Sequence, residues 1–240
     1  MKKIFCSLVL SVVALFIVTA CSQTPKDSVV TLETSLGVIT LKLYNDTPLH
    51  RDNFMKRVTD GDYDSVIFHR VIEDFVIQSG DTTSKNAEPS VVYGDVENEE
   101  LIPNEIRPNH IHRKGVLAAA RSGNDSNPER KSSCFQFYFV KGKVYSLEEL
   151  TELAAKVAES RHKEFFILGN PKFKEVPFGL TDEQIETYTT VGGIPFLDGE
   201  YTVFGEILEG MDVLERIISV ETDYYDRPTE DILILKATLR

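Results

Sequence analysis

The feature that most constrains the fold is a series of short apolar segments, each rich in β-branched or aromatic residues and each followed by a turn signal. Residues 29–44 alternate apolar and polar side chains around Ser35-Leu36-Gly37, a pattern typical of a β-hairpin. Six or more short strands with few helices predict a mainly β fold, a barrel or closed sheet capped by helices. The further apolar runs lie at 65–71, 74–81, 115–122, 134–140, 201–208 and 231–239.

Two helices are predicted within this series of strands. Thr47-Pro48 supplies an N-cap and a first helical residue, and an apolar pattern continues to about Val58. The amphipathic segment 211–218 predicts a second helix near the C-terminus. These two helices are the expected caps of the barrel.

The charge of the chain argues against nucleic acid as a partner. Its 240 residues carry 38 acidic and 26 basic side chains, a formal net charge of −12, and the acidic residues are spread along the chain. Phosphate binding needs clustered Lys and Arg instead. No cofactor is expected, and His110 and His112 form an H-x-H pair without a third ligand for a metal.

The N-terminus is typical of a bacterial lipoprotein signal. Lys2 and Lys3 precede an apolar stretch at 4–18, and small residues then lead to Cys21, as in a lipobox. We therefore expect Cys21 to be lipidated and to hold the protein at a membrane. The alternative is ordinary cleavage after Ala20, which would leave Cys21 unmodified.

This signal implies a division of the chain and a location. Residues 1–20 would be the signal peptide, 21–28 a lipidated tether and 29–240 the folded domain. The predicted location is the bacterial cell envelope, and Ser22 favours the outer membrane, facing the periplasm. Cys134 would be the only cysteine of the domain, so we expect no intramolecular disulfide. The domain is expected to be monomeric.

The segment FHRVIEDFVIQSGD, residues 68–81, combines core-forming side chains with a cation and an amide. Its Phe, Val and Ile residues are typical of a buried strand, yet Arg70 and Gln78 lie among them. Either these polar side chains lie on a solvent face, or they point into a shared cleft.

The same segment resembles the signature of the cyclophilins, a family of peptidyl-prolyl cis-trans isomerases. Three further segments resemble family motifs in the same order: GVLAAARS at 115–122, FQFYFV at 135–140 and FLDGEYTVFGEILEGMDVLERI at 196–217. The resemblance covers about 29–140 and 196–240. It implies an eight-stranded antiparallel barrel with a helix over each end, and X-Pro segments of exported proteins bound to the outside of that barrel.

The resemblance also implies a role for particular residues. Arg70 would donate to the amide that twists, the two glutamines would orient Arg70 and bind the peptide backbone, and an apolar pocket would hold the proline ring. The implied catalytic residues are Arg70, Phe75, Gln78 and Gln136. The implied substrate-binding residues are Val76, Ala119, Ala120, Arg121, Tyr138, Phe196, Leu197 and Tyr201.

Alternation along 134–140 supports part of this assignment. It places Gln136 and Tyr138 on one side of the strand and Phe135 and Phe137 on the other. His69 is expected to be structural, stacking or hydrogen-bonding beneath the site.

Five positions depart from the common family pattern. Phe196 stands where many members have the Trp that cyclosporin contacts, so weaker drug sensitivity is expected. Arg121 replaces an Asn and adds a cation at the groove edge. The other replacements are Val76 for Met, Tyr138 for Phe and Tyr201 for His.

The block from about 141 to 195 is an insertion relative to the minimal family pattern. The capping-box pairs Ser146/Glu149 and Thr181/Gln184 predict an amphipathic helix and a short second helix within it. The insertion could be a client-selecting lid beside the groove or an inert addition.

Three functions are considered from the sequence alone. The first is an envelope foldase that isomerises X-Pro bonds. The second is a binding module whose groove recognises Pro-containing partners without turnover, and the third is a lipocalin-like carrier with an open apolar lumen. Substitution of Arg70 by alanine separates the first two, because a foldase would lose most of its isomerisation rate, whereas a binder would keep its peptide affinity largely unchanged.

Overall fold

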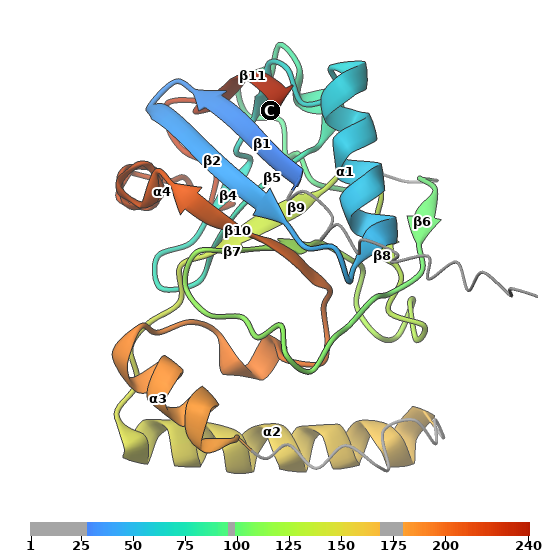
Figure 1. Cartoon of the computed structure of the whole chain (residues 1–240), viewed down its shortest axis with the longest axis vertical. Helices are drawn as coiled ribbons and strands as arrows, with labels where there is room; N and C mark the ends of the chain where they lie inside the picture. Colours follow the sequence, from blue (N-terminus) through green and yellow to red (C-terminus); the bar gives the residue numbers. More distant parts are fainter. Residues whose placement is uncertain (1–27, 96–98, 169–179) are drawn as a thin grey trace, which may run out of the picture.

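The computed structural model describes residues 28–95, 99–168 and 180–240 (Figure 1). The expected signal peptide, the lipidation site Cys21 and all of the tether except Ser28 lie outside these residues. Ser28 itself is the first residue of the first strand. Within the described residues, no helix is both long and apolar enough to cross a membrane.

The core of the structure is a curled antiparallel sheet (Figure 1). The sheet has nine strands in the order β3-β11-β1-β2-β10-β7-β9-β5-β4, and a separate pair is formed by β6 and β8. The main strands are β1 (Ser28–Thr34), β2 (Gly37–Leu43), β3 (Val66–Ile67), β4 (Arg70–Val71), β5 (Val76–Ser79), β7 (Val116–Ala119), β9 (Phe137–Val140), β10 (Val203–Glu209) and β11 (Leu233–Leu239). The pair is β6 (Leu101–Ile102) with β8 (Ser132–Ser133).

The predicted fold class is therefore confirmed, but the strand count is nine in the main sheet and not eight. The run at 65–71 is divided, because β3 pairs with β11 whereas β4 pairs with β5. Phe68 and His69 lie between these two strands, and Phe68 donates its backbone N–H to the carbonyl of Ile232.

Side chains fill the interior of the sheet. Phe54, Phe137 and Phe204 are buried there, with ring centroids 5.2 and 5.5 Å from Phe54 to the other two. These closely packed aromatic rings fill the interior and leave no open lumen of the kind that a lipocalin-like carrier needs. The carrier hypothesis is therefore wrong for this chain.

The two predicted capping helices are confirmed. Helix α1 (Pro48–Asp60) buries His50, Phe54 and Val58, and α4 (Met211–Ile218) buries Val213, Leu214, Ile217 and Ile218. They lie on opposite sides of the sheet (Figure 1). The described residues also include the 3-10 turns η1 (Thr82–Ser84) and η3 (Pro195–Leu197).

The insertion forms two helices beneath the sheet, α2 (Leu147–Leu168) and α3 (Asp182–Thr190) (Figure 1). Both predicted capping boxes are present: Ser146 and Glu149 exchange bonds of 3.1 and 2.8 Å, and Thr181 and Gln184 do the same at 3.2 and 2.9 Å. Each box satisfies two backbone donors at the start of its helix.

The two ends of the insertion are held together. The Gly193 N–H donates to the Lys143 carbonyl at 3.0 Å, and the Lys143 N–H donates back at 3.3 Å. Gly193 has φ +148°, and a Cβ there would lie 2.2 Å from the carbonyl oxygen of His112. Only glycine permits this close approach. The insertion therefore leaves and rejoins the domain at one fixed point.

Candidate active site

Strand pairing places the predicted site residues in a row. Arg70 on β4 pairs with Gln78 on β5, Gln78 pairs with Tyr138 on β9, and Tyr138 pairs with Ala118 on β7. Residues directly opposite each other in an antiparallel sheet project from the same face. The register of three neighbouring strand pairs therefore brings a guanidinium, an amide and an aromatic ring together on one side of the sheet.

A cavity of about 110 Å³ lies over this row. Nine of the twelve predicted site residues line it, and they come from β4, from β5 and the residue before it, from β9, from the segment after β7, and from η3 and the segment after it. These nine are Arg70, Phe75, Val76, Gln78, Ala120, Arg121, Tyr138, Leu197 and Tyr201. We call this cavity the proline pocket, after the role that the resemblance to the cyclophilins implies for it. Its floor is a second apolar cluster outside the main core, which includes Val76, Tyr138 and Val203.

The other three predicted residues lie apart from the pocket wall. Gln136 lies beside it and accepts a 2.8 Å hydrogen bond from Gln78 Nε2. Phe196 is at the rim, 36% exposed, and its ring stacks on Phe75 with centroids 6.0 Å apart. The structure corrects the prediction that Ala119 lines the substrate groove, because its side chain packs in the main core. Strand alternation explains this, since Ala118 and Ala120 face outward on either side of it.

Tyr138 is the buried floor of the pocket, at 4% exposure. The predicted alternation is confirmed for Tyr138 and Phe137, since Phe137 packs in the main core. Phe135 does not join that core; it lies under the guanidinium of Arg57, 4.1 Å from its ring centroid.

The hydroxyl of Tyr138 belongs to a buried network that sequence reasoning missed. His112 Nε2 lies 3.0 Å from the Tyr138 hydroxyl, and His112 Nδ1 lies 3.0 Å from Asp198 Oδ1. Tyr188 of α3 donates to Asp198 Oδ2 at 2.7 Å. Burial raises the pKa of Tyr138 well above its ordinary value, so the hydroxyl stays protonated. The insertion thus supports the floor of the proline pocket through a chain of side-chain contacts.

Arg70 is half exposed and points its charge at the mouth of the pocket. Its Nε lies 3.6 Å from Asp226 Oδ2, and its guanidinium lies 5.8 Å from the centroid of the Phe75 ring. The two glutamines bond to each other, and Gln136 Nε2 donates to the carbonyl of Gly94 at 3.0 Å. Asp226, which belongs to no motif of the sequence, therefore forms an ion pair with Arg70.

His69 lies behind Arg70 and is 4% exposed. Neither ring nitrogen has a hydrogen-bond partner among the described residues, so of the two contacts expected for His69, stacking or hydrogen bonding, the hydrogen bond is absent there. Burial, followed by the nearby charge of Arg70, lowers the pKa of His69 to about 4 despite the opposing influence of Asp81. The imidazole is therefore neutral at physiological pH, as expected of a structural ring.

Gly94 fits against this imidazole. It has φ +103°, and a Cβ there would lie 2.8 Å from His69 Nε2. Its N–H donates to Asp81 Oδ2 at 2.7 Å while its carbonyl accepts from Gln136. Gly94 therefore fixes one end of the glutamine pair.

Arg121 is held in place and is not a mobile cation at the groove edge. Its Nε donates to the Glu200 carbonyl at 2.8 Å, and its guanidinium lies 4.4 Å from the centroid of the Tyr201 ring. Its side chain is only 3% exposed. The arrangement can therefore hold an extended peptide between fixed donors and an apolar pocket.

The expected absence of a metal site remains a prediction. No group of three or more potential ligands gathers within residues 28–95, 99–168 and 180–240. His112 is occupied by Asp198 and Tyr138, and His110 contacts Asp46.

Comparisons with known proteins show the family of this chain. The family model described as "Cyclophilin type peptidyl-prolyl cis-trans isomerase/CLD" matches residues 29–239. A Neurospora crassa protein named peptidyl-prolyl cis-trans isomerase-like 1 is 31% identical over 210 residues, which are 87% of this chain and 91% of that protein.

Two crystal structures of a cyclophilin-type isomerase from Cryptosporidium parvum have the same fold. One matches with a TM-score of 0.57 and 22% identity, and it covers 89% of this chain and 98% of its own. The other, determined in the presence of the dipeptide Ala-Pro, matches with a TM-score of 0.56 and 21% identity, and it covers 88% and 98%.

The chain belongs to the cyclophilin-type peptidyl-prolyl cis-trans isomerase family. It is therefore an isomerase of the cyclophilin type, with a helical insertion between β9 and η3.

Proposed function

We propose that this isomerase acts on X-Pro bonds of exported proteins in the bacterial envelope, through the groove centred on Arg70. The observation that carries the proposal is the row from Arg70 through Gln78 to Tyr138, which opens into the proline pocket. A cation at the mouth of an apolar pocket suits an X-Pro segment, whose ring is apolar and whose amide is polar. The Cryptosporidium relative crystallised in the presence of Ala-Pro supports this class of ligand.

The chemistry requires no covalent step. Resonance in the C–N bond imposes a barrier of ~18–20 kcal/mol, and uncatalysed X-Pro isomerisation takes tens of seconds or longer. A turnover of ~10³ per second requires about 6–7 kcal/mol of preferential stabilisation of the twisted amide.

Arg70 is proposed to supply much of that stabilisation. When the amide twists, the prolyl nitrogen recovers its lone pair and becomes a better acceptor for a guanidinium N–H. Arginine stays charged at any relevant pH and presents several donors in a fixed geometry. Asp226, 3.6 Å away, is proposed to hold the guanidinium over the pocket.

The pocket is proposed to bind the proline ring of the substrate. Phe75, Val76, Leu197 and the Tyr138 ring would immobilise the pyrrolidine and keep out the water that stabilises the planar amide. Gln78 and Gln136 would then hold the backbone before the proline, because their mutual bond fixes both amides beside the pocket.

The location is proposed from the N-terminal signal. Cleavage before Cys21 and its lipidation would place the domain on the outer membrane, facing the periplasm, where exported chains fold.

Refolding of an exported protein tests the proposed client class. A denatured exported protein whose native state contains a cis proline refolds in a slow, proline-limited phase. We expect catalytic amounts of the wild type to accelerate this phase and an Arg70→Ala variant to have little effect. Equal acceleration by both proteins would exclude the Arg70-centred mechanism.

A further inference from the structure

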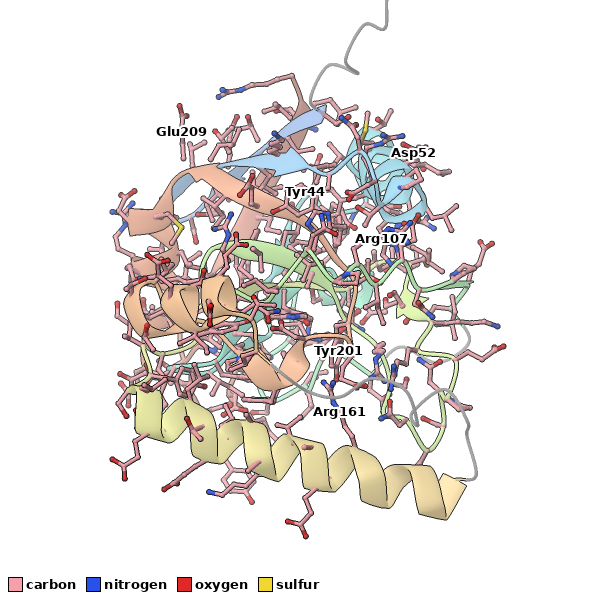
Figure 2. All side chains as sticks on the ribbon, turned by 60° about the horizontal axis from the view of Figure 1, so that its bottom comes forward. Tyr44, Asp52, Arg107, Arg161, Tyr201 and Glu209 are labelled. Atoms are coloured by element: carbon pink, nitrogen blue, oxygen red, sulfur yellow. The ribbon has the colours of Figure 1, made fainter. Side chains whose placement is uncertain are left out.

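Two features adjoin the proline pocket. On its Tyr201 side lies the insertion, and Figure 2 shows Arg161 between α2 and Tyr201. On its Arg70 side lies another hollow, of about 350 Å³, and Arg70 lines both it and the proline pocket. We call it the tyrosine hollow, because its lining includes Tyr93, Tyr224 and Tyr225.

Two segments far apart in the sequence form the walls of the tyrosine hollow. The first is 90–93, and the second is the loop 223–227, which also contains Asp226, the ion-pair partner of Arg70. The loop is tied to the strand that carries Arg70, because the Val71 N–H donates to the Asp226 carbonyl at 2.8 Å. The hollow is therefore fixed in place relative to Arg70.

Arg227 joins the two walls. It is buried, and its Nη1 donates to the carbonyls of Glu88 and Val91, both at 2.9 Å. Its Nε and Nη2 donate to the carboxylate of Asp231 at 3.0 and 2.8 Å, and its guanidinium lies 5.3 Å from the centroid of the Tyr93 ring. Because these bonds hold the walls in place, a ligand would lose little binding free energy to ordering them.

The tyrosine hollow presents apolar side chains to solvent. Tyr224 and Tyr225 are 92% and 60% exposed, and their rings meet edge to face with centroids 5.2 Å apart. Val91 and Val92 in the other wall are also exposed. Single exposed apolar side chains are common on protein surfaces, but four that line one hollow are typical of a binding surface.

The charged groups of the hollow already have partners. Arg70 is paired with Asp226 and Arg227 with Asp231. Asp223 Oδ1 accepts two backbone N–H groups of its own loop, at 2.8 and 3.0 Å. The ligand chemistry therefore follows from the rings and the valines. Aromatic rings favour another ring, in edge-to-face or offset contact, beyond the apolar area that the contact buries.

We propose that the tyrosine hollow is a second substrate subsite, which accepts an aromatic side chain from the residues that follow the proline of the client. This inference rests on the proposed function, which assigns the residues before the proline to Gln78 and Gln136. The chain after the proline then crosses Arg70 into the hollow. An extended chain spans about 3.3 Å per residue, so three residues cover about 10 Å, enough to pass one arginine side chain.

Matched peptides test the proposal with the full chain in phosphatidylcholine nanodiscs. Each peptide contains one proline in an alanine-glycine background, with Phe at the first, second or third position after the proline. The control for each peptide carries Leu there, an apolar side chain without a ring. NMR titration gives Kd and exchange spectroscopy gives the cis-trans rate. We expect at least one position to bind about fivefold more tightly with Phe than with Leu.

Three variants locate the effect. The double variant Tyr224→Ala/Tyr225→Ala removes both exposed rings and should bring the Phe/Leu affinity ratio close to one. The double variant Tyr224→Phe/Tyr225→Phe keeps both rings and should keep the ratio, because the hydroxyls are not required. Leu147→Ala removes an apolar side chain of similar exposure, 61%, from α2, outside the hollow, and should leave the ratio unchanged.

The outcomes separate the two claims. Accelerated exchange with equal affinity for the Phe and Leu peptides overturns the subsite and leaves the proposed function intact. A preference for Phe that survives the loss of both rings does the same. Failure of the wild type to accelerate exchange in any peptide overturns the proposed function, and the subsite with it.

Discussion

At the scale of single residues, the proline pocket depends on polar groups that lie beneath its apolar surface. Tyr138 presents a ring to the pocket and a hydroxyl to His112, and His112 in turn contacts Asp198. Tyrosine can replace phenylalanine here because the buried hydroxyl has a partner. Alternation along the strand predicted the side on which Tyr138 lies. Nothing local predicted His112, whose partners are far away in the sequence.

Removal of the Tyr138 hydroxyl tests this network. A Tyr138→Phe variant keeps the apolar floor but leaves His112 Nε2 buried without a partner, so we expect a loss of about 1–2 kcal/mol in the free energy of unfolding. Urea denaturation measures the loss. Tyr225→Phe is the control, because Tyr225 is 60% exposed and its hydroxyl is not part of the network. Equal effects of the two substitutions would contradict the structural role of the hydroxyl.

His69 should make the protein sensitive to acid. Its folded-state pKa of about 4 lies below the ordinary value of 6.5, so the unfolded chain binds the proton first as the pH falls. The stability that neutral His69 contributes is complete above pH ~6.5 and is lost as the pH falls toward ~4.

A His69→Phe variant measures this contribution. Between pH 7 and pH 4.5 we expect the wild type to lose about 2 kcal/mol more of its free energy of unfolding than the variant. Urea denaturation at the two pH values gives both differences. Parallel losses would show that His69 does not titrate as a buried neutral ring.

At the scale of secondary-structure elements, local signals were the most informative. The hairpin around Ser35, the N-terminus of α1 and both capping boxes of the insertion were predicted from a few adjacent residues. The division of 65–71 into β3 and β4 was not, because it depends on different partner strands, β11 and β5. Likewise, the ion pair of Arg70 with Asp226 depends on a C-terminal loop that no motif marked.

At the scale of elements, Gly193 joins the two ends of the insertion and leaves no room for a side chain. An alanine Cβ would lie 2.2 Å from the His112 carbonyl oxygen and 2.8 Å from the Arg113 Cα, and the backbone at φ +148° favours glycine. We expect Gly193→Ala to lower the free energy of unfolding by about 3 kcal/mol or more. The control is Gly123→Ala, since a Cβ there meets nothing within 4 Å. Calorimetric midpoints that shift equally in both variants would show that the ends of the insertion are not tightly held.

At the scale of the whole molecule, the fold is a packed sheet with its site on the outside and an insertion beside that site (Figure 1). The family motifs predicted the sheet, the proline pocket and most of its residues. They could not predict how α2 lies against the domain, because the residues that face one another there come from three segments: α2, the loop from Arg121 to Asn124, and the stretch from Phe196 to Tyr201.

The proposed lipid anchor gives a prediction at this same scale. Expressed in bacteria with labelled palmitate, the full chain should incorporate label and sediment with membranes, because two or more acyl chains anchor a protein stably. Cys21→Ala should abolish the labelling, whereas Cys6→Ala, in the apolar stretch of the signal, should not. Label retained by Cys21→Ala would contradict lipidation at that residue.

The most direct test of the central claim is cis-trans exchange of a short X-Pro peptide, followed by NMR, with the wild type and Arg70→Ala. Removal of a donor that stabilises the twisted amide should lower the exchange rate by ~10²–10³-fold and leave peptide Kd within about threefold. That result would establish Arg70 as the centre of catalysis. An Arg70→Ala variant that exchanges the peptide as fast as the wild type would contradict the account.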